Sequence, residues 1–267
     1  MTTVFGTSGS FWASDSRWTF KQAGIRVDDH ATRKVVSAFG ELTFFAGDEH
    51  PILVQQASIL ELITNDQYLR LVGALADKDE AYEMLVIAES DGTIIALDDA
   101  HQYACHRPHI GTNLWYIGSG GEYACEFFHY SDKKPHVSNR GCNILGAMRY
   151  ASAKDGNTGG DVKYQVWRPG MFTGRISDPC CYLPGDDEEY RSYLTRQIRS
   201  LEALLEGDDM EQLGTGAAQA STLASKMSSV GSSASGSLRK VSLSSEISRL
   251  ESRLARREAQ KAAQETR

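Results

Sequence analysis

Residues 2–15 read Thr-Thr-Val-Phe-Gly-Thr-Ser-Gly-Ser-Phe-Trp-Ala-Ser-Asp, and this stretch decides the fold. Two short runs of strand-forming residues flank Ser8-Gly9, a turn pair, which predicts a β-hairpin. A two-residue turn at that point places Thr2 directly opposite Asp15, with Cβ atoms about 5 Å apart. Removal of Met1 would expose Thr2, and a threonine with a free α-amine is a nucleophile that carries its own base.

A second hairpin is predicted from residues 34–38 and 41–45, which flank Phe39-Gly40. Its register places Lys34 beside Phe45 and within two rungs of Gly47. With Asp15, these residues supply what an N-terminal nucleophile needs. Lys34 is a cation that lowers a pKa, Asp15 is an anion that holds the cation, and Gly47 offers a backbone N–H to an oxyanion.

The rest of residues 1–183 contains both helix and strand patterns. Helices are predicted at 52–63 and 68–75, followed by strands at 84–88 and 93–97 around Ser90-Asp91-Gly92. A strand at 113–117 leads through a glycine-rich turn into a helix at 122–128, and a late strand covers 163–167. Hairpins combined with two helical layers indicate an α+β sandwich.

The composition is that of an ordinary globular protein, with 267 residues, 41% of them hydrophobic, and 28 Lys/Arg against 35 Asp/Glu. The acidic balance argues against a nucleic-acid-binding protein. No apolar run is long enough to span a membrane, and the N-terminus lacks a signal-peptide pattern. The five cysteines are scattered, which favours reduced thiols. We therefore expect a cytoplasmic protein that binds neither membrane nor nucleic acid.

The C-terminal part of the chain divides into three segments. A helix is predicted at 184–213 on the spacing of Leu194, Ile198, Leu201 and Leu205. Residues 214–237 hold nineteen Gly, Ala, Ser or Thr out of 24, the composition of a linker. Residues 238–267 carry eight Lys/Arg against four Glu, which predicts a basic helix. Its apolar seam is Leu243, Ile247, Leu250 and Leu254.

Each of these two helices has an apolar seam of about two heptads. Such a seam can dock on the protein's own domain, dock on a partner, or form a coiled coil, and the pattern leaves these alternatives open.

Six short motifs follow one another between residues 2 and 170. They are Thr2-Thr3-Val4, Asp15-Ser16-Arg17-Trp18-Thr19, Arg33-Lys34-Val35, Phe45-Ala46-Gly47-Asp48, Ile117-Gly118-Ser119-Gly120-Gly121-Glu122-Tyr123-Ala124 and Lys154-Asp155-Gly156-Asn157-Thr158-Gly159-Gly160. In this order they resemble the signature of the proteasome β-type N-terminal nucleophile (Ntn) hydrolases, which include bacterial proteasome-like peptidases. The resemblance implies a four-layer αββα sandwich that assembles into homo-oligomeric rings and hydrolyses peptide bonds with neither metal nor cofactor.

The resemblance also implies catalytic roles. Thr2 would be the nucleophile, and its α-amine the general base, acting through a water. Lys34 would tune the pKa of the nucleophile, Asp15 would hold Lys34, and the Gly47 N–H would stabilise the tetrahedral intermediate. The interval from Thr2 to Asp15 is a few residues shorter than in the family, and residues 184–267 have no counterpart in its simpler members.

Four further positions match the family. Ser119, Asp155 and Thr158 would orient the N-terminal amine and relay its proton, with Thr158 where the family usually has serine. Thr19 would pair with the backbone of a substrate bound between residues 19–21 and 47–49 by strand addition.

Weaker signals favour ordinary readings. Gly118–Gly121 resembles a dinucleotide loop, but Tyr123 breaks the motif. A zinc site could use residues of the 101–109 segment, although a surface loop is the favoured interpretation. Cys180-Cys181 reads as two free thiols. A basic row near the C-terminus could contact an acidic partner or phosphate, or could be a solvated helix face. The zinc-site residues are His101, Cys105, His106 and His109, and the basic row is Arg249, Arg253, Arg256 and Arg257.

The leading hypothesis is therefore a threonine-type peptidase that degrades unfolded polypeptide delivered by an ATP-dependent unfoldase. The main alternative is a catalytically inactive, proteasome-like structural protein. It would be a component of a larger particle, for example a viral one, and would bind neighbouring subunits or an assembly partner through its C-terminal tail. A third hypothesis is an amidase that acts on a small molecule with the same nucleophile.

Overall fold

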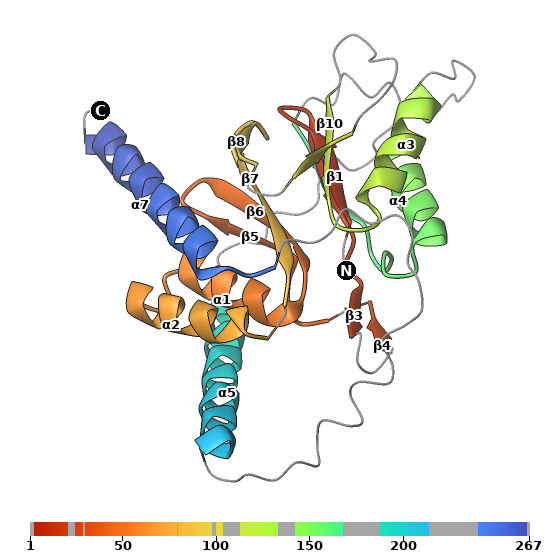
Figure 1. The fold of residues 1–267 in the computed structure, drawn as a ribbon. Coiled ribbons are helices and arrows are strands. Elements are labelled where there is room, and N and C mark those ends of the chain that lie inside the picture. Colours follow the sequence, from red (N-terminus) through yellow and green to blue (C-terminus); the bar gives the residue numbers. More distant parts are fainter. Residues whose placement is uncertain are drawn as a thin grey trace.

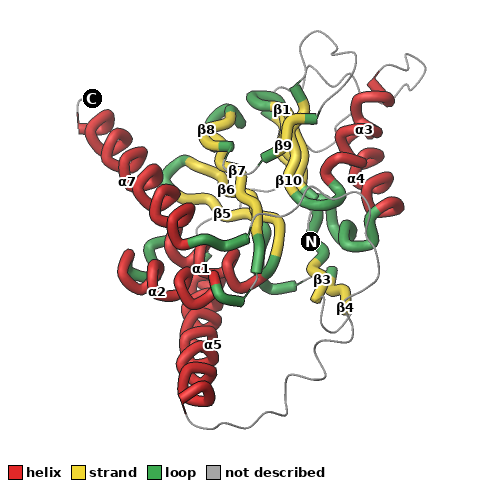
Figure 2. The backbone as a smooth tube through the Cα atoms, viewed as in Figure 1, coloured by secondary structure: helices red, strands yellow, loops and turns green. Residues whose placement is uncertain are grey.

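The computed structural model describes residues 3–20, 25–28, 30–78, 80–97, 100–103, 113–132, 142–167, 187–213 and 240–265. These residues form two larger antiparallel sheets, a two-stranded ribbon and six helices. Figures 1 and 2 show one sheet beside a pair of helices and the other sheet above a second helical group. The described part of the chain is thus a mixed α/β fold built on antiparallel sheets.

The first sheet has the strand order β11 (Lys163–Val166), β2 (Phe11–Ser14), β1 (Val4–Thr7), β10 (Leu114–Ile117) and β9 (His101–Gln102). Successive side chains of a strand point to opposite faces. Phe5 and Phe11 consequently share one face, where both rings contact Phe128 of α3 (Gly121–Asp132). α4 (Cys142–Lys154) packs alongside α3, so this helical pair covers the sheet (Figure 1).

The second sheet has the order β5 (Val35–Ala38), β6 (Glu41–Gly47), β7 (Tyr82–Ala88) and β8 (Ile94–Ala96). Leu42 and Leu85 belong to a buried cluster that also contains Val4 and Trp12 of the first sheet. The opposite face, which includes Phe45, packs against α1 (Glu49–Ile59) and α2 (Asn65–Ala76). The two sheets therefore share one core and carry helices on other faces.

The predicted register of the first hairpin is wrong by one residue. Thr7 pairs with Phe11, and Val4 pairs with Ser14, so three residues rather than two form the turn. Gly9 takes a positive φ of 67°, and the Ser10 N–H donates to the Thr7 carbonyl. The consequence is that Asp15 faces Thr3 instead of Thr2.

The register of the second hairpin is confirmed. Val35 pairs with Phe44, and the Phe45 N–H donates to the Lys34 carbonyl at 2.9 Å. Phe39 and Gly40 both have positive φ, 55° and 72°, which is the geometry of a tight two-residue hairpin turn.

The seam predicted for the 184–213 helix is buried. α5 (Glu188–Leu213) packs its seam residues into the core beside α1. The buried side chains are Leu194, Ile198, Leu201 and Leu205.

The seam predicted for the last helix is not the face that docks. α7 (Leu243–Glu265) extends along α2 and the second sheet (Figure 1). Leu250 is buried, but Leu243, Ile247 and Leu254 are exposed. Of the polar side chains of α7, Glu246 and Arg253 are buried and the other members of the basic row are half-buried, so a polar face makes the contact.

Two further differences concern helices. The helix predicted at 52–63 spans 49–59 and ends before Glu61, which has a positive φ of 57°. α4 was not predicted, although Ile144, Ala147, Met148 and Ala151 recur at helical spacing and are buried.

No helix in the described part of the chain is long and apolar enough to cross a membrane. The linker at 214–237 and Cys180-Cys181 lie outside the described residues, and the division into segments stays a prediction.

Candidate active site

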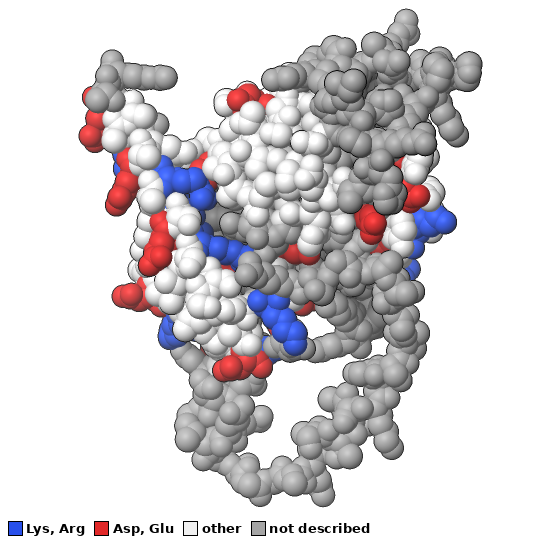
Figure 3. Space-filling view, turned by 45° about the horizontal axis from the view of Figure 1, so that its top comes forward, with Lys and Arg blue, Asp and Glu red and all other residues white. Residues whose placement is uncertain are grey.

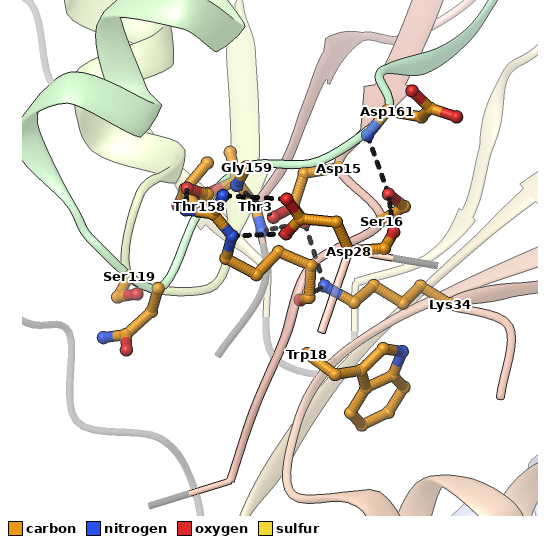
Figure 4. Close-up of polar contacts among 12 residues, drawn as sticks. Thr3, Asp15, Ser16, Trp18, Asp28, Lys34, Ser119, Thr158, Gly159 and Asp161 are labelled. Atoms are coloured by element: carbon orange, nitrogen blue, oxygen red, sulfur yellow. Dashed lines mark hydrogen bonds and ion pairs between the residues drawn. The ribbon is translucent and has the colours of Figure 1, made fainter. Parts of the chain in front are cut away.

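Asp15 lies directly after β2 and is almost fully buried. One carboxylate oxygen accepts the Thr3 N–H at 3.0 Å, and the other accepts the Gly159 N–H at 2.9 Å. The same oxygen that faces Thr3 lies 3.1 Å from Lys34 Nζ. These donors are fixed by the sheet and the 155–160 loop, so the carboxylate is held from three sides (Figure 4).

Lys34 lies at the start of the second hairpin, with 3% of its side chain exposed. Its ammonium also donates to the Arg17 carbonyl and lies 5.4 Å from the centre of the Trp18 ring. Burial lowers the pKa of Lys34 and raises the pKa of Asp15, and the attraction between the two groups opposes both shifts. A buried lysine with a lowered pKa is suited to tuning a neighbouring nucleophile.

A chain of hydroxyl groups connects Asp155 to the N-terminal strand. Ser119 Oγ donates to Asp155 Oδ2 at 2.5 Å, and Thr158 Oγ1 donates to the same oxygen at 2.9 Å. Thr158 Oγ1 in turn lies 2.6 Å from Thr3 Oγ1. A side chain at Gly120 would collide with both threonine hydroxyls, so glycine is required at the crossing point. The structure thus brings Ser119, Asp155 and Thr158 together beside Thr3.

Gly47 ends β6 with a φ of 134°, a backbone conformation open to glycine. A side chain there would collide with the backbone of Ala81 and Tyr82. Thr19 lies in the ribbon of β3 (Trp18–Phe20) and β4 (Ile25–Val27), where it pairs with Arg26. The Thr19 hydroxyl is buried and has no hydrogen-bond partner among the described residues.

Thr2 and Met1 lie outside the described residues. Five of the other predicted site residues form two connected groups that meet at Thr3. In the first group, Asp15 accepts the Thr3 N–H and pairs with Lys34. In the second, the Thr158 hydroxyl contacts the Thr3 hydroxyl, and Asp155 accepts from both Thr158 and Ser119. The catalytic roles of all these residues stay predictions.

Arg17 and Asp28 form a contact that the sequence alone does not predict. Arg17 donates through Nε and Nη2 to the two Asp28 oxygens, at 2.6 and 3.0 Å, and through Nη1 to the Thr158 carbonyl at 3.0 Å. This pairing lowers the pKa of Asp28. It also joins the ribbon to the loop that carries Asp155. No spacing rule signals such a pair, because Arg17 comes just before β3 and Asp28 just after β4, outside any regular element.

A polar cavity of about 270 Å³ opens beside Asp15 and Lys34. Its walls carry both signs of charge, since Lys34 and Lys163 line it together with Asp28 and Asp161. Within the described residues, no group of three or more His, Cys, Asp or Glu side chains could hold a metal ion. Of the candidate zinc ligands, Cys105, His106 and His109 lie outside that part of the chain.

No family model and no curated protein matches this chain. Similar solved structures include eukaryotic HslV from Trypanosoma brucei, at 16% identity and a TM-score of 0.38, covering 61% of this chain and 98% of that one. Another is Thiobacillus denitrificans BPH in complex with epoxomicin, at 17% identity and a TM-score of 0.38, covering 62% and 96%. At this identity and TM-score, the likeness bears on neither the site nor the activity.

Proposed function

We propose that this chain is a proteasome-type Ntn hydrolase that cleaves peptide bonds with Thr2 as its nucleophile. The observation that carries the proposal is the buried pair of Lys34 and Asp15. The Asp15 carboxylate of this pair also accepts the main-chain N–H of Thr3. Thr3 is the residue after Thr2, so in the observed register Asp15 binds the main chain one residue along from the proposed nucleophile. A buried lysine and an anion beside a chain terminus are what an N-terminal threonine requires.

The reaction starts once Met1 is removed and the Thr2 α-amine is free. That amine accepts the proton of the Thr2 hydroxyl through a water, and Oγ forms a bond to the substrate carbonyl carbon. The Gly47 N–H donates to the resulting oxyanion. The amine returns its proton to the leaving nitrogen as the peptide bond breaks, and a water then hydrolyses the acyl-enzyme. The Ser119, Asp155 and Thr158 groups keep the amine oriented through this cycle.

The same proposal includes the four-layer αββα order, a homo-oligomeric ring and an unfolded polypeptide substrate. The substrate would bind as an added strand against Thr19, whose backbone belongs to the ribbon next to Asp15. A ring that encloses such sites needs an ATP-dependent unfoldase to supply extended chain.

The test is the intact mass of the purified protein before and after incubation with a peptide epoxyketone, a reagent that needs both a hydroxyl and a free amine. We expect loss of Met1 and one adduct per chain, with no adduct in Thr2→Ala. That variant should fold normally and have no turnover. Residual peptide hydrolysis by Thr2→Ala would refute the N-terminal nucleophile.

The second candidate function is assembly without catalysis, favoured by the exposed apolar row Leu243, Ile247 and Leu254 on α7. A protein that keeps Met1, forms no adduct and co-assembles through its tail would support this alternative. Turnover of small amides without peptide cleavage would instead support an amidase.

A further inference from the structure

Glu246 of α7 is a buried carboxylate that binds three other elements. It accepts hydrogen bonds from Tyr68 of α2 at 2.7 Å, Tyr82 of β7 at 2.8 Å and Gln55 of α1 at 2.5 Å. Arg249, one turn further along α7, lies 2.6 Å from it. A buried carboxylate is stable only with such partners, so this cluster forms only when α7 is docked.

The segment before α7 adds to the same region through its backbone. Lys240 forms an antiparallel bridge with Ala81, and the Val241 N–H donates to the Glu80 carbonyl at 3.0 Å. The Val241 side chain is buried. Residues 240–241 therefore act as a short extra strand beside the start of β7.

The other side of residues 80–82 contacts the Gly47 end of β6. The Asp48 N–H donates to the Ala81 carbonyl at 2.8 Å, and the Ala81 N–H donates to the Asp48 carboxylate at 3.0 Å. Gly47 pairs with Tyr82, so closely that no side chain fits at Gly47. A single backbone segment thus lies between the tail and the proposed oxyanion donor.

We propose that the tail, residues 240–265, positions the Gly47 N–H, with Glu246 as the positioning residue that acts through Tyr82 and Gln55. This inference rests on the proposed function of Gly47. An oxyanion donor must be held in place before the charge develops, and a displacement of about 1 Å can lower a rate by about 10²-fold. Gln55 gives a second connection from Glu246 to Gly47, because α1 starts directly after Asp48 and continues through Gln55.

The basic row of α7 provides the matched control. Arg257 lies near the far end of the helix, where it donates to Glu61 and to the Ile59 carbonyl and covers the Phe39 ring. Figure 3 shows Lys and Arg side chains gathered where this helix meets the rest of the molecule. Arg257→Ala removes docking contacts as Glu246→Leu does, but at a point remote from Gly47.

The experiment measures kcat and KM for a fluorogenic peptide, together with amide hydrogen exchange of residues 44–50. Glu246→Leu is expected to lower kcat by about tenfold or more with KM within twofold, and to speed exchange at 44–50. Glu246→Gln, which keeps an oxygen acceptor for both tyrosines, should recover most of kcat. Arg257→Ala should leave kcat and that exchange within twofold of the unmodified protein.

Equal losses of kcat in Glu246→Leu and Arg257→Ala would overturn the proposal, because docking in general would then be the cause. If Glu246→Leu does not fold, Val241→Pro is the second variant. It removes the hydrogen bond from the Val241 N–H to Glu80 and leaves the polar residues around Glu246 unchanged. The same results are expected from it. If the unmodified protein forms no epoxyketone adduct, the proposed function fails on its own account. In that case, amide exchange at 44–50 still tests whether the tail positions Gly47. Unchanged exchange in both Glu246→Leu and Val241→Pro would refute that link.

Discussion

Two buried carboxylates, Asp15 at the site and Glu246 in the tail, are held in contrasting ways. Two of the donors to Asp15 are backbone N–H groups, those of Thr3 and Gly159. Three of the donors to Glu246 are side chains from elements 164 or more residues away in sequence, those of Tyr82, Tyr68 and Gln55. The first sheet and the 155–160 loop fix the first carboxylate, whereas only docking of α7 creates the environment of the second.

The cations differ too. Lys34 is buried beside Asp15 and its pKa is lowered by burial, so its charge depends on its surroundings. Arg249 beside Glu246 keeps its charge under all ordinary conditions. A titratable lysine suits a site where a proton moves, and an arginine suits a contact that has only to hold. The first region therefore suits the proposed chemistry, and the second suits docking.

The largest effect is expected from Lys34→Met. Asp15 would stay buried without its cation, which costs about 3–5 kcal/mol in the free energy of unfolding. Peptide turnover should fall by at least about 10²-fold, because the nucleophile loses the group that tunes its pKa. Urea unfolding and the rate of epoxyketone adduct formation measure the two losses.

Lys163→Met is the control for this change, since Lys163 lines the same cavity but lies on β11. It should affect neither quantity strongly. Wild-type adduct formation in Lys34→Met would show that the buried pair serves stability alone.

A smaller effect is expected at Thr158, where two substitutions separate the hydroxyl from the methyl group. Thr158→Val removes the bonds to Asp155 and Thr3 and should lower kcat by about 10²-fold. Thr158→Ser keeps the hydroxyl and should stay near the wild-type rate. Similar kinetics for the two variants would exclude a role for this hydroxyl in the relay.

The register of the hairpins shows how far the sequence leads. For the second hairpin, Phe39-Gly40 allows a two-residue turn, and the predicted neighbour of Lys34 is confirmed. For the first, Ser8-Gly9 belongs to a three-residue turn, which local pattern does not distinguish from a shorter one. Asp15 therefore was predicted in the right place along the chain but opposite the wrong threonine.

The tail shows where sequence patterns fail. Apolar spacing predicts the inward face of α5 correctly, because that face packs into an ordinary core. In α7 the inward face carries Glu246 and Arg253, which look like solvated positions in a sequence. Their burial depends on Tyr68, Tyr82 and Ser58, partners distant along the chain. No local pattern contains that information.

Tyr82→Phe should weaken the docking of the tail and leave the contact between Asp15 and Lys34 intact. The Tyr82 hydroxyl donates to the Glu246 carboxylate and also accepts from Gln55 and Arg249. Loss of a hydrogen bond to a charged group costs about 1.5–3 kcal/mol, so the free energy of unfolding should fall by at least that amount. Tyr150→Phe is the control, because the ring contacts of Tyr150 with Phe127 and Lys154 survive the change. Urea unfolding of both variants gives the difference, and equal stabilities would mean that Glu246 finds other donors.

The smallest effect concerns pH and links the tail to the helix after Gly47. His50 of α1 lies 2.7 Å from the Glu80 carboxylate, and the hydrogen bond between these two side chains raises the pKa of His50 above 6.5. The backbone carbonyl of Glu80 accepts the Val241 N–H of the tail. Because the folded state binds the proton more tightly, the stabilisation is complete below the unfolded pKa of 6.5 and is lost as pH rises through the folded value.

His50 is 41% exposed, so the contribution should stay below about 1 kcal/mol. In urea unfolding at a series of pH values, the stability advantage of the unmodified protein over His50→Gln should therefore shrink as pH rises. An advantage that is constant across that range would show that the pairing with Glu80 is geometric rather than ionic. The tail would then contact Glu80 through its backbone alone, and its docking would be insensitive to pH at this point.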